Sequence, residues 1–338
     1  MDLDAGSPYR VKLTVANPVF CDTLLSIIHH EFINMTVKWH YKTDKVVEQF
    51  LKWNTYSPGH TDVNVTGLIA PPQIGALKTL YKDKIVRDDR NAWPAAIGSV
   101  VHMGLERIGK NYKDYLVEEF LTTVDKGVTW GGHIDAQVTT PDGLIIRDYK
   151  TTKVFKVKKL MYGYDDADRD WETQLNLYAL LVKRNKPDTK IAGIEVLVLF
   201  SDFSLPTAEE GGDYPERSVM TLQFPLWTLK QQEEYVHSRL DLWAHQQQAM
   251  DLHEEFIPCT DEERWKKPDV FKVMSKSTHR SRRNFTNEKD AEAFVKSQAE
   301  PEKFYIQTTR GLPLRCRLFC DVAPFCKQYQ NELNEGEN

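Results

Sequence analysis

The chain has 338 residues, of which 41% are hydrophobic and 28% charged, and its formal net charge is −5. This length suffices for about two domains of ordinary size, or for one domain with large insertions. The composition excludes a disordered or fibrous chain. The small excess of acid excludes a protein that coats nucleic acid by bulk charge, so any nucleic-acid site has to be local.

Neither a membrane span nor a signal peptide is recognisable. No stretch approaches the roughly 18–20 apolar residues that a span needs. The first residues, MDLDAGSPYRVKLTV, lack a basic segment followed by an apolar one. The sequence therefore predicts a cytoplasmic protein that does not contact a membrane.

Helical patterns prevail in the first third of the chain. Residues 17–35 mix apolar and polar positions as an amphipathic helix does, and residues 72–83 form a second predicted helix. A third helix is predicted to open at Pro94, because proline is tolerated in a first turn. The apolar stripe of this helix consists of Ile97, Val101, Leu105 and Ile108.

A β-meander follows, and then helices alternate with a strand. The predicted strands cover residues 115–124, 128–140 and 144–150, with a tight turn at 141–143 between the last two. A mostly buried helix at 171–184, a strand at 191–203 and a long amphipathic helix at 226–250 come next. The element order is thus α, β, β, β, α, β before the long helix.

These patterns suggest three regions. Residues 1–64 have no assigned role, residues 65–250 form the core, and residues 251–338 form a C-terminal extension. The boundary is placed near 251–258 because Pro258 and Pro268 interrupt the helical pattern there.

Two carboxylates and one ammonium are predicted to meet at one edge of the sheet. Asp135 ends the segment GGHID, and Asp148 and Lys150 end LIIRDYK on the next strand. Two hard oxygen ligands with open water positions suit Mg²⁺ beside a phosphate. Lys150 lies on the same strand face as Asp148, where it could orient a water or stabilise developing charge.

The Asp–x–Lys pattern alone is weak, since it more often marks a strand end with a solvated charge pair. The interpretation as a catalytic site is supported by further residues that occur in a fixed order along the chain. His102 lies on the preceding predicted helix, and Gln174 and Tyr178 lie four residues apart on the following one.

With these motifs the sequence resembles the RecB-type branch of the PD-(D/E)XK nuclease superfamily, which includes phage exonucleases and CRISPR-associated adaptation nucleases. The matching segments are GSVVHMGLE (98–106), GGHIDAQ (131–137), IIRDYKTTK (145–153) and QLNLY (174–178). The resemblance implies an α/β restriction-endonuclease-like core, a mixed sheet flanked by helices. To this core the chain would add an N-terminal helical region and a cysteine-rich C-terminal extension.

The resemblance also implies roles for single residues. His102, Asp135, Asp148 and the backbone carbonyl of Tyr149 would ligate Mg²⁺ or Mn²⁺, and Lys150 would activate the water. Gln174 and Tyr178 would position substrate or support the site. Asp148 stands where many relatives have Glu, which shortens the reach by a methylene.

The implied function is a metal-dependent DNA exonuclease in phage DNA replication, recombination or repair. It would act on linear DNA or single-stranded ends, with recombination or replication proteins as candidate partners. Two alternatives stay open. One is an endonuclease of the same superfamily, and the other is a non-catalytic DNA-binding or assembly protein on a nuclease scaffold.

Two basic runs without acids are candidate DNA contacts, although each could also be an ordinary solvated surface. The second run ends at Phe285, whose ring could stack on a base. The basic residues singled out are Lys153, Lys156, Lys158 and Lys159 in the first run, and Arg280, Arg282 and Arg283 in the second.

Three closely spaced cysteines, Cys316, Cys320 and Cys326, could ligate one structural metal, either Zn²⁺ or a [4Fe–4S] cluster. Cys259 is the candidate fourth ligand, and Cys21 is its rival. The tail resembles the cysteine patch of RecB-type phage nucleases. In iron–sulfur relatives, however, one cysteine precedes the nuclease motifs, and residues 65–78 of this chain contain none. Reduced, metal-free thiols are the alternative.

Overall fold

The computed structural model describes residues 36–38, 44–52, 60–162 and 170–336. The helix predicted for residues 17–35 lies outside the described residues, as does Cys21. The chain divides into two units, residues 1–33 and 34–338, and everything described below belongs to the second.

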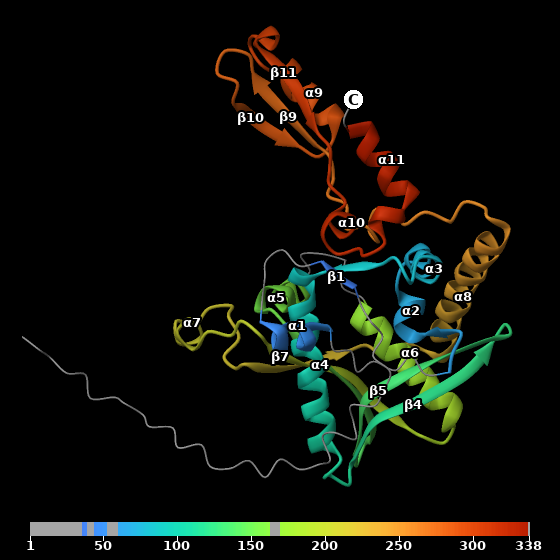
Figure 1. Ribbon diagram of the computed structural model, residues 1–338. Helices are drawn as coiled ribbons and strands as arrows, with labels where there is room; N and C mark the ends of the chain where they lie inside the picture. Colours follow the sequence, from blue (N-terminus) through green and yellow to red (C-terminus); the bar gives the residue numbers. More distant parts are fainter. Residues whose placement is uncertain (1–35, 39–43, 53–59, 163–169, 337–338) are drawn as a thin grey trace, which may run out of the picture. The chain divides into compact units, whose positions relative to one another are not determined.

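The main sheet has six strands and mixed direction, as predicted (Figure 1). The expected meander is present as β4 (Tyr115–Asp125), β5 (Val128–Thr140) and β6 (Gly143–Thr152), all antiparallel. β7 (Ile191–Phe200) adds in parallel to β6, and β8 (Val219–Phe224) closes that edge in antiparallel direction. The short β2 (Val63–Asn64) runs parallel to the first half of β5.

A two-residue turn sets the register of β4 against β5. Lys126 and Gly127 have φ values of 50° and 77°, and two successive positive φ angles are typical of a type I′ hairpin turn. Starting at this turn, β4 and β5 pair without a shift of register, from the pair Asp125–Val128 to the pair Tyr115–Val138.

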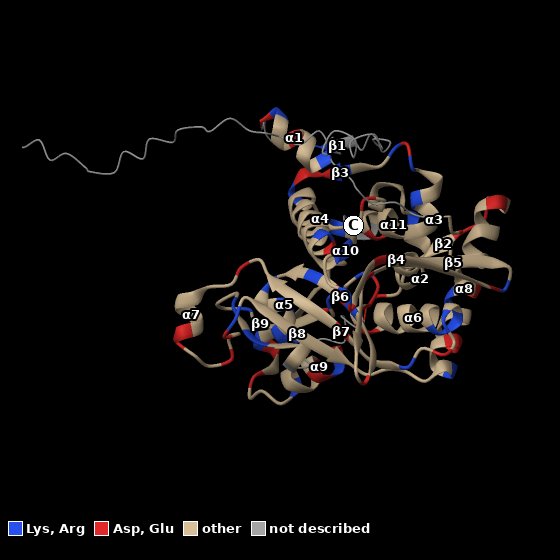
Figure 2. Cartoon of the chain, turned by 90° about the horizontal axis from the view of Figure 1, so that it is seen from below, with Lys and Arg blue, Asp and Glu red and all other residues tan. Residues whose placement is uncertain are grey.

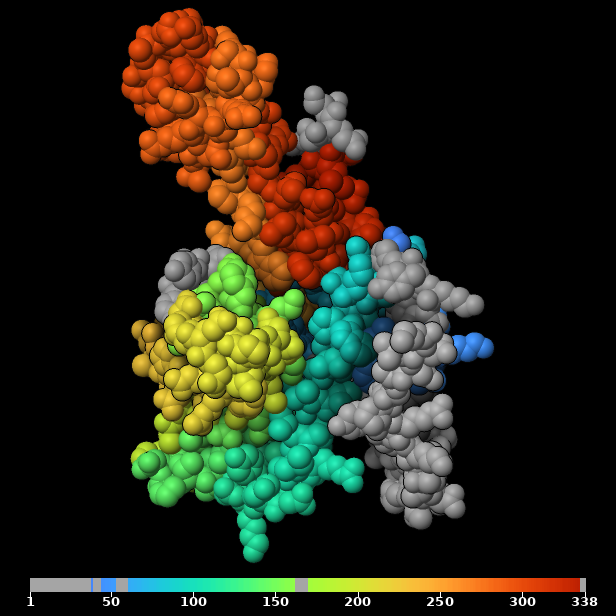
Figure 3. All heavy atoms as spheres, turned by 90° about the vertical axis from the view of Figure 1, so that its left-hand side faces the viewer, coloured from blue at the N-terminus to red at the C-terminus, as the bar shows by residue number. Residues whose placement is uncertain are grey.

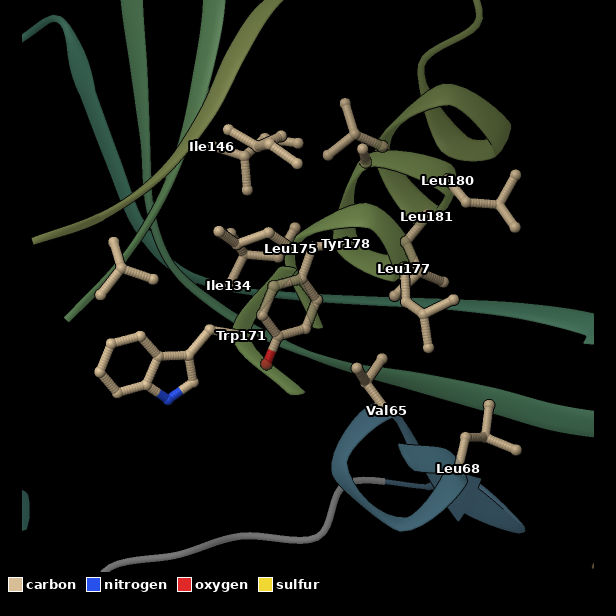
Figure 4. Close-up of a cluster of buried hydrophobic side chains, with 14 of the residues drawn as sticks. Val65, Leu68, Ile134, Ile146, Trp171, Leu175, Leu177, Tyr178, Leu180 and Leu181 are labelled. Atoms are coloured by element: carbon tan, nitrogen blue, oxygen red, sulfur yellow. The ribbon is translucent and has the colours of Figure 1, made fainter. Parts of the chain in front are cut away.

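The core of the molecule surrounds α6 (Asp170–Asn185), whose middle turns are buried (Figure 4). Leu175 and Leu177 of this helix are fully buried, together with Ile134 of β5 and Ile146 of β6. The remaining helices of this part are α2 (Val65–Ile69), α3 (Pro72–Leu80), α5 (Val154–Tyr162), α7 (Leu205–Glu209) and α8 (Leu229–Leu252).

The helix α4 (Asp89–Gly109) contacts β4, β5 and β6. The prediction that it opens at Pro94 was wrong, because the helix begins five residues earlier, at Asp89. Asp88 caps it by accepting a hydrogen bond from the Arg90 N–H. Pro94 lies within the helix, near its N-terminal end, where its missing N–H removes one backbone hydrogen bond.

The C-terminal part contains a small sheet and three further helical pieces. We call residues 270–309 the arm: β9 (Val270–Ser275), β10 (Ser281–Phe285), α9 (Glu288–Lys296) and β11 (Phe304–Thr309), with β9 in the middle of the sheet. Figure 3 shows the arm in orange, joined by a narrow segment to the red surface of α10 (Leu314–Leu318) and α11 (Lys327–Gly336). A second apolar cluster, with Leu77, Val322 and Cys326, connects α3 to this C-terminal segment.

Short elements complete the described chain: β1 (Thr36–Lys38) pairs in parallel with β3 (Val86–Asp88), and α1 (Lys45–Lys52) precedes β2. Among the described residues, the helices are all too short or too polar to cross a lipid bilayer.

Candidate active site

The two predicted carboxylates lie where β5 and β6 separate. The antiparallel ladder between these strands ends at the pair Ala136–Arg147, so Asp135 and Asp148 come directly beyond its last rung. The N–H of Tyr149, no longer used by the ladder, donates to Oδ2 of Asp135 at 2.8 Å. The splitting of the strands therefore creates a polar opening and orients one of its carboxylates.

His102 reaches this opening from α4, as predicted. Its Nδ1 lies 3.4 Å from Oδ2 of Asp135, and its ring meets that of Tyr149 edge to face. Burial disfavours the imidazolium, but the hydrogen bond to Asp135 and the charges of Asp135 and Asp148 outweigh this and raise the pKa of His102.

Glu118 of β4 also belongs to the site, and the sequence analysis missed it. Ligand atoms of His102, Glu118 and Asp135 all lie within 4.8 Å of one another. Burial and the nearby charge of Asp135 raise the pKa of Glu118 to about 7. Its φ of 52° is unusual for glutamate, and such backbone conformations occur often at functional sites.

Glu118 could have been found from the register. The Lys-Gly turn at 126–127 places it opposite Asp135, between the pairs Val117–Ala136 and Glu119–Ile134. Residues directly opposite each other in an antiparallel pair have neighbouring side chains. The signal was present in the sequence, but it required the turn to be recognised.

The buried Asp148 and the half-buried Lys150 form an ion pair beside α6. Nζ of Lys150 lies 2.6 Å from Oδ2 of Asp148 and donates to Oε1 of Gln174 at 3.2 Å. Gln174 in turn donates to the Tyr178 hydroxyl at 2.9 Å. The structure thus brings the four predicted residues into one chain of polar contacts.

The pKa values of this pair follow from burial and mutual charge. Burial raises the pKa of Asp148 to about 6, against the opposing effect of the Lys150 ammonium. Burial acts against the Lys150 ammonium, but the carboxylates of Asp148 and Asp135 outweigh it and raise the pKa of Lys150. Lys150 is therefore a cation at neutral pH.

The donors fit a hard divalent cation. An imidazole and two carboxylates converge within 4.8 Å, which is the ligand type that Mg²⁺ and Mn²⁺ accept. The Tyr149 carbonyl lies on the same side of its strand as the Tyr149 N–H, which donates to Asp135, so it too borders the opening. Asp148 is not part of this compact group, and its Oδ2 lies 2.6 Å from Nζ of Lys150.

Most of the first basic run forms α5. Lys158 is ion-paired with Asp213 at 2.6 Å. Lys156 lies over the Trp171 ring and Lys159 over the Phe155 ring. Lys153 stands just before the helix.

The second basic run forms the β9–β10 hairpin of the arm. Arg280 and Arg282 are exposed there. Arg283 stacks on the rings of Phe285 and Phe294, and these two rings contact each other. The ring of Phe285 is thus packed against α9, whose acidic residues Figure 2 shows in red.

Cys259, Cys316, Cys320 and Cys326 line one small pocket. Burial raises the pKa of Cys259 to about 12 and that of Cys316 to about 11, and the neighbouring thiols add to both shifts. The Cys259 thiol donates to Oε1 of Gln73 at 3.2 Å. No three of these four described sulfur atoms lie within 4.8 Å of one another. A zinc site needs sulfur atoms about 3.8 Å apart, from Zn–S bonds of about 2.3 Å in a tetrahedron.

The chain was compared with known proteins. The crystal structure of SSO0001 is similar with 16% identity and a TM-score of 0.38, over 66% of this chain and 93% of that one. A protein of Eubacterium rectale, named as a presumed exonuclease, is similar with 11% identity and a TM-score of 0.26, over 60% and 72%. Both likenesses are too weak to bear on function. No curated protein matched.

A family model provides the decisive match. The model of the PD-(D/E)XK nuclease superfamily matches residues 98–327, which is more than half of the chain. The matched range begins at α4 and includes His102, Asp135, Asp148 and Lys150. It follows that this chain belongs to the PD-(D/E)XK nuclease superfamily.

Proposed function

We propose that this protein is a divalent-metal-dependent DNA exonuclease. The observation that carries the proposal is the convergence of His102, Glu118 and Asp135 within 4.8 Å, one strand away from the ion pair of Asp148 and Lys150. A degenerate, non-catalytic member of the superfamily would be expected to lack a carboxylate or the lysine, and this chain has the full set.

His102, Glu118, Asp135 and the Tyr149 carbonyl would hold the metal. When bound, a divalent cation lowers the pKa of a water ligand and neutralises charge on the phosphate. The Lys150 ammonium, fixed by Asp148 and Gln174, would stabilise the negative charge that grows on the phosphoryl oxygens. A water oxygen forms the new bond to phosphorus as the bond to the leaving oxygen breaks.

Basic residues of the two runs would contact the DNA backbone. We assign this role to Lys153, Lys156, Lys158 and Lys159 near α5, and to Arg280 and Arg282 on the arm. Arg283 would contribute charge from its position over Phe285 and Phe294. A role in phage DNA replication, recombination or repair rests on the resemblance to phage nucleases.

We further propose that the four cysteines hold a structural group, either Zn²⁺ or a [4Fe–4S] cluster. The support is that four thiols from two distant segments line one small pocket, and thiolates are ligands of both groups. It would connect the segment at Cys259 to the segment at 316–326 rather than take part in hydrolysis.

The test compares wild type with Lys150→Ala on end-labelled linear DNA and on covalently closed circles, with Mg²⁺, Mn²⁺ or EDTA. Metal-dependent loss of linear DNA alone, abolished in the variant, is the expected result. Cleavage of circles would show an endonuclease. DNA binding without any cleavage would leave the scaffold alternative standing.

A further inference from the structure

Two aromatic rings are exposed at the base of the arm, outside the site described above. Trp265 is 39% exposed and Phe319 is 53% exposed, and their ring centroids are 5.5 Å apart at an angle of 63°. Leu318, beside Phe319, is 49% exposed. Burying such rings would have been favourable, so their exposure suggests a partner that covers them.

The backbone at Trp265 supports the same view. Its φ is 51°, a conformation that costs energy for a bulky residue. The peptide groups around it are tied to the C-terminal segment, since Leu314 donates to the Trp265 carbonyl and Arg315 to the Arg264 carbonyl. The indole is therefore held in a fixed place at the surface.

Two arginines, Arg315 and Arg317, accompany these rings, and the Trp265 segment also carries the acids Glu262 and Glu263. The Arg315 guanidinium lies over the indole at 4.6 Å and also donates to the Glu263 carbonyl, and Arg317 is exposed on the same short helix. The nearest acid of the next segment, Asp321, has Arg87 as a partner at 3.9 Å. We call Trp265, Arg315, Arg317, Leu318 and Phe319 the platform.

The platform is connected to the helix that carries His102. Asn91, in the first turn of α4, donates to the Leu318 carbonyl at 2.7 Å. Eleven residues of helix separate Asn91 from His102, which corresponds to about 16 Å at about 1.5 Å per residue. About five stacked nucleotides, each rising about 3.4 Å, span that distance.

We propose that the platform binds single-stranded DNA, stacking a base about five nucleotides from the phosphate held at the active site. Exposed rings flanked by arginine recognise unpaired bases, because bases in a duplex are already stacked on each other. The inference rests on the proposed nuclease function, which supplies the strand, and it names the form of DNA that the site takes.

The test measures binding of labelled oligothymidylates of about four and about twelve nucleotides by fluorescence anisotropy, in EDTA, with the full chain. We expect Trp265→Ala/Phe319→Ala to weaken binding of the longer strand by about tenfold or more, and to leave the shorter strand unaffected. Tyr112→Ala is the control, since this ring is 56% exposed beyond the other end of α4. It should bind both strands like wild type.

Two further variants guard against a folding defect. Trp265→Phe keeps a ring and should retain affinity while losing part of the tryptophan quenching that the longer strand causes in wild type. Arg317→Glu reverses one exposed charge. It should weaken binding of the longer strand more than binding of the shorter one, with the largest effect at low salt.

The proposal would be overturned if wild type and the double variant bound the longer strand with equal affinity. It would also be overturned if the double variant lost affinity for both strand lengths to the same extent. Because no metal is present, the result is independent of hydrolysis. Length-dependent binding without cleavage would reject the nuclease function and keep the platform. DNA cleavage together with binding that does not depend on strand length would keep the nuclease function and reject the platform.

Discussion

At the scale of single residues, most charged groups of the site have a hydrogen-bond partner or an opposite charge beside them. Asp135 accepts the Tyr149 N–H and faces His102 at 3.4 Å, while Asp148 is neutralised by Lys150 at 2.6 Å. Glu118 is the exception, because burial, together with the nearby carboxylate of Asp135, raises its pKa to about 7. A cation at this point would relieve that repulsion, so Glu118 is the residue whose behaviour reports most directly on metal binding.

Glu118→Gln should weaken Mn²⁺ binding by about tenfold or more, since it removes a charged ligand while keeping the size of the side chain. Isothermal titration of the full chain with Mn²⁺ measures this without any DNA. Glu119→Gln is the matched control. Glu119 contacts Gln137 and Lys186 instead, so this variant should bind Mn²⁺ like wild type.

The same titration should depend on pH. Glu118 must lose its proton before it can bind a cation, and its raised pKa of about 7 means that Mn²⁺ affinity increases as pH rises through neutrality. Between about pH 6 and about pH 8, one released proton corresponds to about a tenfold gain. His102 contributes in the same direction, so Glu118→Gln should flatten the profile without abolishing its slope. An equal slope in both proteins would contradict the assigned pKa.

At the scale of elements, the position of the site depends on how closely β4 and β5 approach. Gly131 of β5 is paired with Thr122, and a Cβ there would lie 2.2 Å from the Leu121 carbonyl oxygen. The strand pair therefore requires glycine at this position. The neighbouring Gly132 has more room, because its nearest contact would be the Tyr178 ring at 3.2 Å.

Gly131→Ala should destabilise the protein by about 3 kcal/mol, because the contact is with backbone that cannot move without opening the ladder. Gly104→Ala, on α4, should instead stabilise it by about 1 kcal/mol, since a Cβ there meets no atom within 4 Å. Urea denaturation of both variants measures these two changes in the free energy of unfolding. A similar midpoint for Gly131→Ala and wild type would show that the strands adapt.

At the scale of the whole molecule, the C-terminal segment returns to the nuclease core through its cysteines and the apolar cluster on α3. Cys326 packs with Leu77 and Val322, and the Cys259 N–H donates to Gln73 of α3. The arm is inserted between Cys259 and Cys316, so any group that the cysteines bind would fix the base of the arm and the platform with it.

Protein purified without oxygen should contain zinc or iron, and Cys259→Ser and Cys316→Ser should each lose the metal and melt at a lower temperature. Elemental analysis and thermal denaturation measure the two effects. Cys21→Ser is the control and should keep both metal content and melting temperature. Stoichiometric zinc in wild type would identify a zinc site, and stoichiometric iron would identify a cluster. Loss of metal in Cys21→Ser would show that Cys21 is a ligand.

The sequence by itself determined the β-meander, the buried helix α6, the strand β7 and the superfamily, because hydrophobic periodicity and the spacing of His102, Asp135, Asp148 and Lys150 are local properties of the chain. It also indicated the four cysteines. It did not predict α5, β8 or the small sheet of the arm. The start of α4 was misplaced, since a capping Asp88 outweighed the signal of Pro94.

Only the tertiary structure decided which groups meet. Glu118 joins His102 and Asp135 because a hairpin register and an unusual backbone angle bring it there. The turn at 126–127 indicates the register in the sequence, but no local pattern shows the angle. Trp265 and Phe319, more than fifty residues apart, form one surface because the arm between them returns to its own base. Contacts of this kind depend on chain topology, which periodicity and spacing do not encode.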